Sequence, residues 1–131
     1  MASRIGYVFL FLFCIGVGIA ARPLSKIAYA YAGPAFTTGD FEDVYRQANR
    51  RVVLFSLSTC RHCEQARTLL EHEHVDYRDY VVDLSADARR RFAALDGDSV
   101  PTLLIGDRRI VGFREQTILA ALSAQSTDKR P

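Results

Sequence analysis

The sequence predicts an α/β domain in which helices flank a mixed sheet of four strands. Short apolar runs rich in β-branched residues alternate with segments whose apolar residues recur at helical spacing. A helix separates the first two strand candidates, which predicts that these strands lie parallel. The turn Gly106-Asp107 joins the last two candidates and predicts an antiparallel hairpin. One uncharged hydrophobic segment precedes this domain.

Length and charge limit the kind of protein. The chain has 131 residues, a formal net charge of +2 and three cysteines. That length accommodates one domain of ~100 residues and an extension. A net charge this small gives no indication of nucleic-acid binding. We also expect the protein to be a monomer. Cys14 stands alone in the hydrophobic segment, and only two cysteines remain for the domain. So few cysteines are not typical of a small protein held together by disulfides.

Residues 5–21 contain no charged side chain and are flanked by Arg4 and Arg22. Their number lies between that of a signal-peptide core and that of a membrane span of ~20 residues. We therefore expect residues 1–22 to be a signal anchor or a cleaved signal peptide, and residues 5–21 to contact the membrane. The expected location of the domain is the extracytoplasmic (periplasmic) side. The cytoplasmic face is the alternative, because the charges on the two flanks are nearly balanced.

The rest of the chain divides into a linker, a domain and a tail. Gly33-Pro34 and neighbouring turn residues predict a linker over residues 23–39. The domain is expected over residues 40–124 and a polar tail over 125–131. The expected elements of the domain are a helix over 40–49, a strand over 52–57, a helix over 64–72, a strand over 75–83, a helix from Ser85 to about Leu95, strands over 100–105 and 108–111, and a helix over 114–122.

Each helix is predicted from one apolar face, and the strands from their composition. The inward residues are expected to be Phe41, Val44, Tyr45 and Ala48 in the first helix, Ala66, Leu69 and Leu70 in the second, Ala88, Phe92 and Leu95 in the third, and Ile118, Leu119 and Leu122 in the last. Residues 52–57 form a nearly continuous apolar run, which is typical of a strand covered on both faces.

Cys60 and Cys63 stand between this strand and the second helix. Strand, C-x-x-C and helix in that order are the layout of a thiol–disulfide redox site. Cysteines three residues apart on a helical turn have Cα atoms roughly 5–6 Å apart, which a disulfide can bridge. Thr59 is the expected N-cap, so the unpaired N–H groups and the dipole of the helix favour a thiolate at Cys60. Cys63 would then resolve a mixed disulfide formed at Cys60.

Arg61 and His62 lie between the two cysteines. A cation beside Cys60 favours its thiolate and makes the dithiol–disulfide couple more oxidising. We expect Arg61 and His62, together with Thr59, to tune the thiolate. The alternative is that the two residues only fill the loop.

A zinc site is a second interpretation of the cysteines. Cys60, Cys63, His72 and His74 provide two sulfur and two nitrogen ligands. If residues 60–72 are one helix, however, His72 lies roughly 13–18 Å along the axis from the cysteines. We therefore expect no metal here.

Three segments resemble the glutaredoxin family. Residues 52–63 resemble its first strand and redox loop, Ser99-Val100-Pro101-Thr102 its Thr-Val-Pro segment, and residues 105–113 its closing hairpin and glycine. The resemblance covers residues 51–122 and implies a thioredoxin-like fold. It also implies that Pro101 is a cis proline facing the cysteines, and that the backbone of Val100 pairs with a bound peptide or glutathione. The alternative for Pro101 is an ordinary proline at a strand start.

The same resemblance assigns Gly112 and Phe113 to the substrate-binding part of the site. Three segments depart from the family pattern. Leu57 stands where many glutaredoxins have a lysine, Asp96-Gly97-Asp98 stands where they have a basic residue or glutamine, and Phe113-Arg114-Glu115 replaces the usual pair of aspartates. These positions often contact glutathione in the family. Gly112-Phe113-Arg114 is closer to glutaredoxin-like proteins that take electrons from thioredoxin reductase, so we expect weak use of glutathione.

We expect a thiol–disulfide oxidoreductase that uses Cys60 and Cys63 to reduce or exchange disulfides in proteins or in mixed disulfides with small thiols. No cofactor is expected beyond a thiol electron donor, such as glutathione or a thioredoxin-reductase-type system. The alternative is a binding module without turnover, in which Cys60 holds glutathione, a metal or a shared iron–sulfur cluster.

Overall fold

A mixed sheet with helices on both faces forms the centre of the domain. The computed structural model describes residues 34–128. The strands lie in the order β1-β5-β4-β2-β3. Their bounds are β1 (Thr37–Thr38), β2 (Val52–Ser56), β3 (Arg78–Val81), β4 (Thr102–Ile105) and β5 (Arg108–Val111), and those of the helices are α2 (Glu42–Ala48), α3 (Arg61–His72), α4 (Ala86–Ala94) and α5 (Glu115–Asp128).

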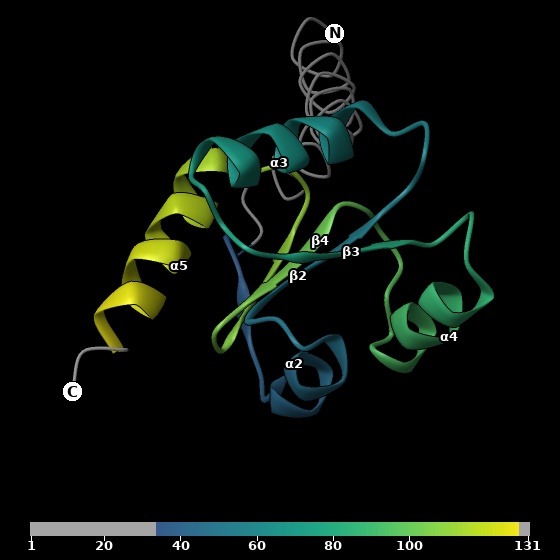
Figure 1. Cartoon of the computed structure of the whole chain (residues 1–131), viewed down its shortest axis with the longest axis horizontal. Helices are drawn as coiled ribbons and strands as arrows, with labels where there is room; N and C mark the ends of the chain where they lie inside the picture. The colour runs from purple at the N-terminus through teal and green to yellow at the C-terminus, as the bar shows by residue number, and fades with distance from the viewer. Residues whose placement is uncertain (1–33, 129–131) are drawn as a thin grey trace, which may run out of the picture. The chain divides into compact units, whose positions relative to one another are not determined.

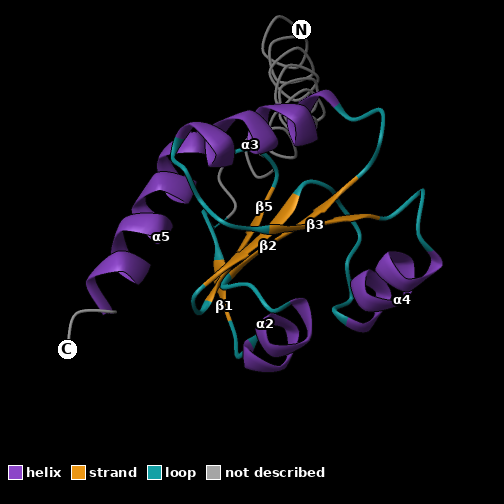
Figure 2. Cartoon of the chain, in the orientation of Figure 1, coloured by secondary structure: helices purple, strands orange, loops and turns teal. Residues whose placement is uncertain are grey.

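The pairing directions follow the prediction. β2 and β3 are parallel, whereas β4 is antiparallel to both β2 and β5. Figure 2 shows these strands as one twisted layer between the helices. The helix between β2 and β3 accounts for the parallel pair, because parallel strands need a crossover connection. The two-residue turn between β4 and β5 accounts for the antiparallel hairpin.

β2 is buried on both faces, so its successive side chains enter two separate cores. Val52 and Leu54 pack with residues of α3 and α5, whereas Val53 and Phe55 pack with residues of α2 and α4. Figure 1 shows α3 and α5 on one side of the sheet and α2 and α4 on the other. The burial of each such side chain stabilises the fold by about 1.5–3 kcal/mol.

The sheet has five strands, where the sequence predicts four. The additional strand, β1, lies within the segment predicted as a linker and pairs antiparallel with β5. The backbone N–H of Gly39 also donates to the carbonyl of Asp107 at 2.9 Å. Thr37 and Thr38 are both exposed, so no pattern of burial marks this strand. Its formation depends on the edge that β5 offers.

α5 extends beyond the predicted helix and into the predicted polar tail. The hydroxyls of Ser123 and Ser126 donate to the carbonyls of Leu119 and Leu122, four residues earlier. These bonds satisfy the two hydroxyls within the helix, so serine is tolerated there although it does not favour helix formation. Gln125 also fixes the helix, because its amide nitrogen donates to the carbonyl of Arg51 at 3.0 Å.

The predicted membrane segment, residues 5–21, lies outside the described residues, as do residues 1–33 and 129–131 in general. Among residues 34–128, no helix combines the length and the hydropathy that a membrane crossing requires.

Candidate active site

The carboxyl end of β2 leads directly into the C-x-x-C loop. Leu57, Ser58 and Thr59 connect the strand to Cys60. Asp83, which follows β3, holds this connection: its carboxylate accepts from the backbone N–H of Ser58 at 2.9 Å and also from the Ser58 hydroxyl. The hydroxyl bond lowers the pKa of Asp83. Because β2 and β3 are parallel, their carboxyl ends lie at the same edge of the sheet. Asp83, at the end of β3, therefore supports the C-x-x-C loop that follows β2.

Cys60 itself caps α3, whereas the sequence predicts Thr59 as the cap. The backbone of Cys60 is extended (φ −95°, ψ 112°), and its Sγ accepts from the N–H of Cys63 at 3.2 Å. Thr59 lies one residue too early to reach this amide and is exposed. The helix begins at Arg61, so Sγ of Cys60 itself occupies the position where α3 presents unpaired N–H groups.

The two thiols have different surroundings. Both are free; Cys60 is half-buried and Cys63 is fully buried. Burial, and next the hydrogen bond with Cys60, raises the pKa of Cys63 to about 12. A hydrogen bond from the backbone of Leu57 and the charge of Arg67 act in the opposite direction on this pKa. Cys63 is therefore protonated and shielded, and Cys60 is the accessible thiol.

Arg61 and His62 are both exposed on the first turn of α3. Nδ1 of His62 lies 2.9 Å from Oε1 of Gln65, in the next turn. Within residues 34–128, the Arg61 side chain forms no hydrogen bond or ion pair, so its predicted effect on Cys60 rests on its position in the motif.

The cis proline predicted from the resemblance is confirmed. The Val100–Pro101 peptide bond is cis, and Pro101 is buried. Thr102, the next residue, pairs with Phe55, so Pro101 lies at the end of the sheet where β2 enters the redox loop. The N–H of Gly112 donates to the carbonyl of Pro101 at 2.8 Å, which places the glycine at the same end.

Val100 and Phe113, the other two predicted substrate-binding residues, flank Pro101 and Gly112 in sequence. Each is half-buried, Val100 against the core under α2 and α4 and Phe113 against the core under α3 and α5. Gly112 has φ +79°, a conformation that glycine adopts readily. The topology therefore brings these predicted residues to the edge that carries the C-x-x-C motif.

A polar network behind the motif was missed from the sequence. Arg67 on α3 donates through Nε to Asp79 on β3 at 2.8 Å and through Nη2 to the Ser56 hydroxyl on β2 at 2.8 Å. Ser56 in turn donates to Asp79 at 2.6 Å. The spacing of Arg67 from Cys63, four residues on one helix face, was a usable signal. No signal marked Asp79, because its place follows from strand pairing.

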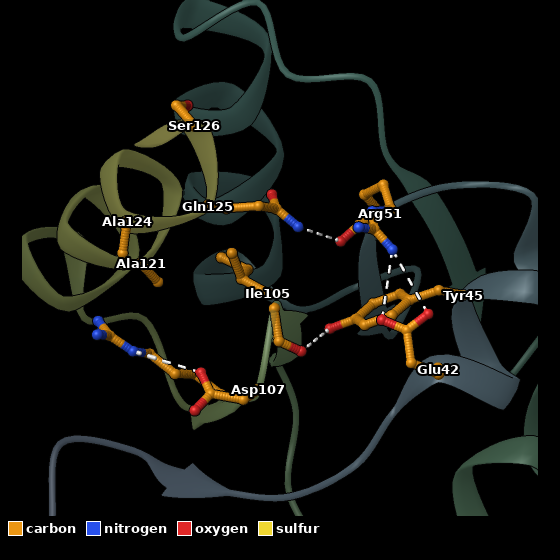
Figure 3. Close-up of a pocket in the computed structure, with 11 residues that line it drawn as sticks. Glu42, Tyr45, Arg51, Ile105, Asp107, Ala121, Ala124, Gln125 and Ser126 are labelled. Atoms are coloured by element: carbon orange, nitrogen blue, oxygen red, sulfur yellow. Dashed lines mark hydrogen bonds and ion pairs between the residues drawn. The ribbon is translucent and has the colours of Figure 1, made fainter. Parts of the chain in front are cut away.

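A pocket of about 670 Å³ lies at the other end of the sheet, beside the turn between β4 and β5 (Figure 3). Its polar groups are engaged in the fold: the Tyr45 hydroxyl donates to the Gly106 carbonyl at 2.8 Å, and Arg51 pairs with Glu42 at 3.3 Å. No cysteine lines it. The C-x-x-C edge, and not this pocket, is the candidate site.

The predicted alternative, a zinc site, would take its ligands from both ends of α3. Residues 34–128 contain no cluster of three or more His, Cys, Asp or Glu side chains that could hold a metal ion. His72, in the last turn of α3, lies beside Glu73 at 3.2 Å and is exposed.

Comparison with known proteins gives consistent matches. The sequence model of the glutaredoxin family matches residues 52–110. A protein of Synechocystis sp. described as a probable glutaredoxin is 31% identical over 64 residues, which are 47% of this chain and 73% of the relative.

Solved structures share the fold. Glutaredoxin grx-1 of Archaeoglobus fulgidus superposes with a TM-score of 0.53 at 26% identity, over 64% of this chain and 98% of that one. The thioredoxin-like protein BC3987 gives a TM-score of 0.51 at 26% identity, over 54% and 99% of the two chains. A buckwheat glutaredoxin in complex with glutathione gives 0.51 at 20% identity, over 67% and 87%, and shares the fold alone.

The fold is therefore thioredoxin-like, as the sequence predicted, with a mixed sheet between two layers of helices. The cis proline and the C-x-x-C motif lie at one edge of that sheet. With the family match and the relative from Synechocystis, these features lead to one conclusion: the chain belongs to the glutaredoxin family.

Proposed function

We propose that the protein is a two-cysteine thiol–disulfide oxidoreductase in which Cys60 attacks and Cys63 resolves. Family membership indicates this class of chemistry. The observation that carries the assignment of roles is the difference between the thiols: Cys60 is accessible at the helix N-terminus, whereas Cys63 is fully buried one turn deeper. A thiolate at a helix N-terminus is stabilised by the N–H groups there.

The reaction would proceed in two exchanges. The Cys60 thiolate attacks one sulfur of a substrate disulfide, forms a mixed disulfide and releases the other sulfur as a thiolate. Cys63 loses its proton and attacks Sγ of Cys60, which forms the Cys60–Cys63 disulfide and releases the second substrate thiol. Two electrons pass from the dithiol to the substrate, and an external thiol donor restores the dithiol. The reverse sequence oxidises a substrate dithiol.

The proposed substrates are disulfides of proteins and mixed disulfides with small thiols. An extended peptide would lie along Val100, next to the cis bond, with Gly112 and Phe113 on the other side of Pro101. This proposal draws on the family resemblance and on the position of these residues beside the redox loop. Gly112 has no Cβ, which leaves room for a close approach of the substrate backbone.

Replacement of Cys63 by Ser should stop turnover with protein disulfides and leave Cys60 in stable mixed disulfides. We expect turnover to fall at least about 100-fold, because an intramolecular attack is replaced by a bimolecular one. The measurement is reduction of a protein disulfide, with trapped adducts identified by non-reducing electrophoresis and mass spectrometry. The matched control, Cys14→Ser, removes a cysteine outside the motif and should keep full turnover.

Full turnover in the Cys63→Ser variant would contradict the two-cysteine mechanism. Activity of that variant confined to glutathione adducts would instead indicate a one-cysteine route for those substrates.

The proposed electron donor is a thioredoxin-reductase-type system, with only weak use of glutathione. Leu57, Gly97 and Arg114 occupy positions that often contact glutathione in the family. The site of Gly97 has no space for a side chain, since an added Cβ would come within 2.3 Å of the Phe92 ring. Arg114 brings a positive charge where the family has a carboxylate for the glutathione amino group, so like charges would repel.

The Arg114→Asp substitution should therefore improve glutathione-dependent turnover. We expect a gain of about tenfold in kcat/KM for glutathione, the size of one charge-assisted hydrogen bond. The assay couples reduction of a glutathione mixed disulfide to glutathione reductase. The control Arg46→Asp makes the same charge change on exposed α2 and should have no such effect. Efficient glutathione use by the parent protein, or no gain in Arg114→Asp, would contradict the proposal.

We also propose that residues 5–21 tether the domain to a membrane, with the domain on the extracytoplasmic side. The support is the uncharged stretch itself and the cation Arg61 beside Cys60, which suits an oxidising compartment. Two reporters fused after residue 131, one active only in the cytoplasm and one only after export, test it. The export reporter should be active, and the double substitution Leu10→Arg and Leu12→Arg should abolish its activity. Activity of the cytoplasmic reporter alone would contradict this location.

A further inference from the structure

Arg67 is a largely buried cation directly behind the redox motif. Its side chain is 18% exposed and contacts three elements of the fold. It pairs with Asp79 on β3 at 2.8 Å and with Glu64 on its own helix at 3.0 Å. It also donates to the Ser56 hydroxyl on β2 at 2.8 Å. Such a set of partners holds the planar guanidinium in one orientation.

The guanidinium and the Cys63 thiol both bond to the backbone of Leu57. Nη2 of Arg67 donates to the carbonyl of Leu57 at 3.4 Å, and the N–H of Leu57 donates to the sulfur of Cys63 and lowers the pKa of that thiol. Residues four apart on a helix also lie on one face, with Cβ atoms about 5–6 Å apart. The fixed positive charge therefore lies one helical turn beyond the buried thiol and acts on it electrostatically.

The buried thiol has a specific need for such a charge. To attack Sγ of Cys60, Cys63 must give up its proton, and that proton passes to the departing substrate thiolate or to solvent. The negative charge then develops on a sulfur that water does not reach. Burial disfavours a charged sulfur, whereas a cation within about 4–6 Å favours it.

We propose that Arg67 is a positioning residue for the resolving step: held by Asp79 and Ser56, its guanidinium stabilises the thiolate of Cys63 as the mixed disulfide at Cys60 is resolved. This inference rests on the proposed two-cysteine function and assigns a residue to its second step. Among the described residues Arg67 bonds to Asp79, Glu64, Ser56 and Leu57 and to neither motif sulfur, so it acts on Cys63 through its charge.

The charged groups around Cys63 determine whether a substitution stabilises or destabilises its thiolate. Cys60 and Arg67 are the ionisable groups that act on it electrostatically, and Asp79 and Glu64 partly neutralise Arg67. Loss of the Arg67 charge should make the Cys63 thiolate less stable. Loss of the Asp79 charge should have the opposite effect, because Arg67 is then less neutralised. Both changes remove the same ion pair, so a purely structural role predicts the same direction for both.

The test compares Arg67→Gln, Arg67→Lys and Asp79→Asn in the full chain, with Cys14→Ser throughout so that only the motif thiols react. The probe is 5,5′-dithiobis(2-nitrobenzoate) in stopped flow. Attack by Cys60 releases the first equivalent of chromophore, and attack by Cys63 on the mixed disulfide releases the second. The rate of the second phase, followed against pH, reports the resolving step.

We expect the second phase of Arg67→Gln to be about tenfold slower at neutral pH, with its pH midpoint raised. The second phase of Asp79→Asn should be faster, with its pH midpoint lowered. The second phase of Arg67→Lys should have nearly the rate and the pH midpoint of the parent protein. The first phase should not change in any variant. Arg91→Gln, which removes an ion pair with Asp87 on α4, is the control and should leave both phases unchanged.

A second phase that slows in both Arg67→Gln and Asp79→Asn, or that changes in neither, overturns the inference. If Arg67→Gln does not fold, Asp79→Asn decides alone: a slower second phase overturns the proposal and a faster one supports it. A parent protein without any second phase would contradict the two-cysteine function as well, whereas a normal parent with unresponsive variants would overturn only the role of Arg67.

Discussion

The burial of β2 on both faces is the constraint on which the other features depend. Its side chains alternate between the core under α3 and α5 and the core under α2 and α4. A shift of one residue in register would send every one of them to the wrong face. The end of the strand is therefore fixed relative to β3 and β4. Because the C-x-x-C loop follows directly, the same constraint places this loop at the end of the sheet where Pro101 lies, with Ser58 bonded to Asp83.

The alternation also explains the polar network. Ser56 continues the series of Val52 and Leu54, so it points toward α3, where Leu54 pairs with Asp79 on the neighbouring strand. A buried hydroxyl and a half-buried carboxylate need hydrogen-bond partners at this position. Arg67 supplies them from α3. The fold thus satisfies its own polar groups with a cation that lies one helical turn from Cys63.

The sequence predicts most of this fold because its signals are local. The apolar run predicts β2. The helix after the cysteines predicts that β2 and β3 are parallel, and the Gly106-Asp107 turn predicts that β4 and β5 are antiparallel. β1 could not be predicted, since two exposed threonines pair only because β5 leaves an edge open. The end of α5 was missed because its serines do not favour a helix and the bond from Gln125 to the carbonyl of Arg51, a tertiary contact, has no local signal.

The candidate site also combines residues that local signals predict with residues that only the folded structure reveals. Cys60 and Cys63 were evident from the motif and its spacing, and Pro101 from the family resemblance. The cap was assigned to Thr59 because threonine is the better capping residue, yet the chain enters the helix one residue later, at Cys60. Asp79 lies 12 residues beyond Arg67 on another element, so only the parallel pairing of β2 and β3 reveals that the two interact.

The central claim is that the fold separates two chemically similar thiols into an accessible nucleophile and a buried resolving group. The direct measurement is an NMR titration of the reduced protein with ¹³Cβ-labelled cysteine, in which each thiol is assigned by the Cys60→Ser and Cys63→Ser variants. We predict that the Cys63 signal remains that of the protonated thiol well above neutral pH, because burial raises the pKa of this group. If Cys63 were to lose its proton near or below neutral pH, the account would be contradicted.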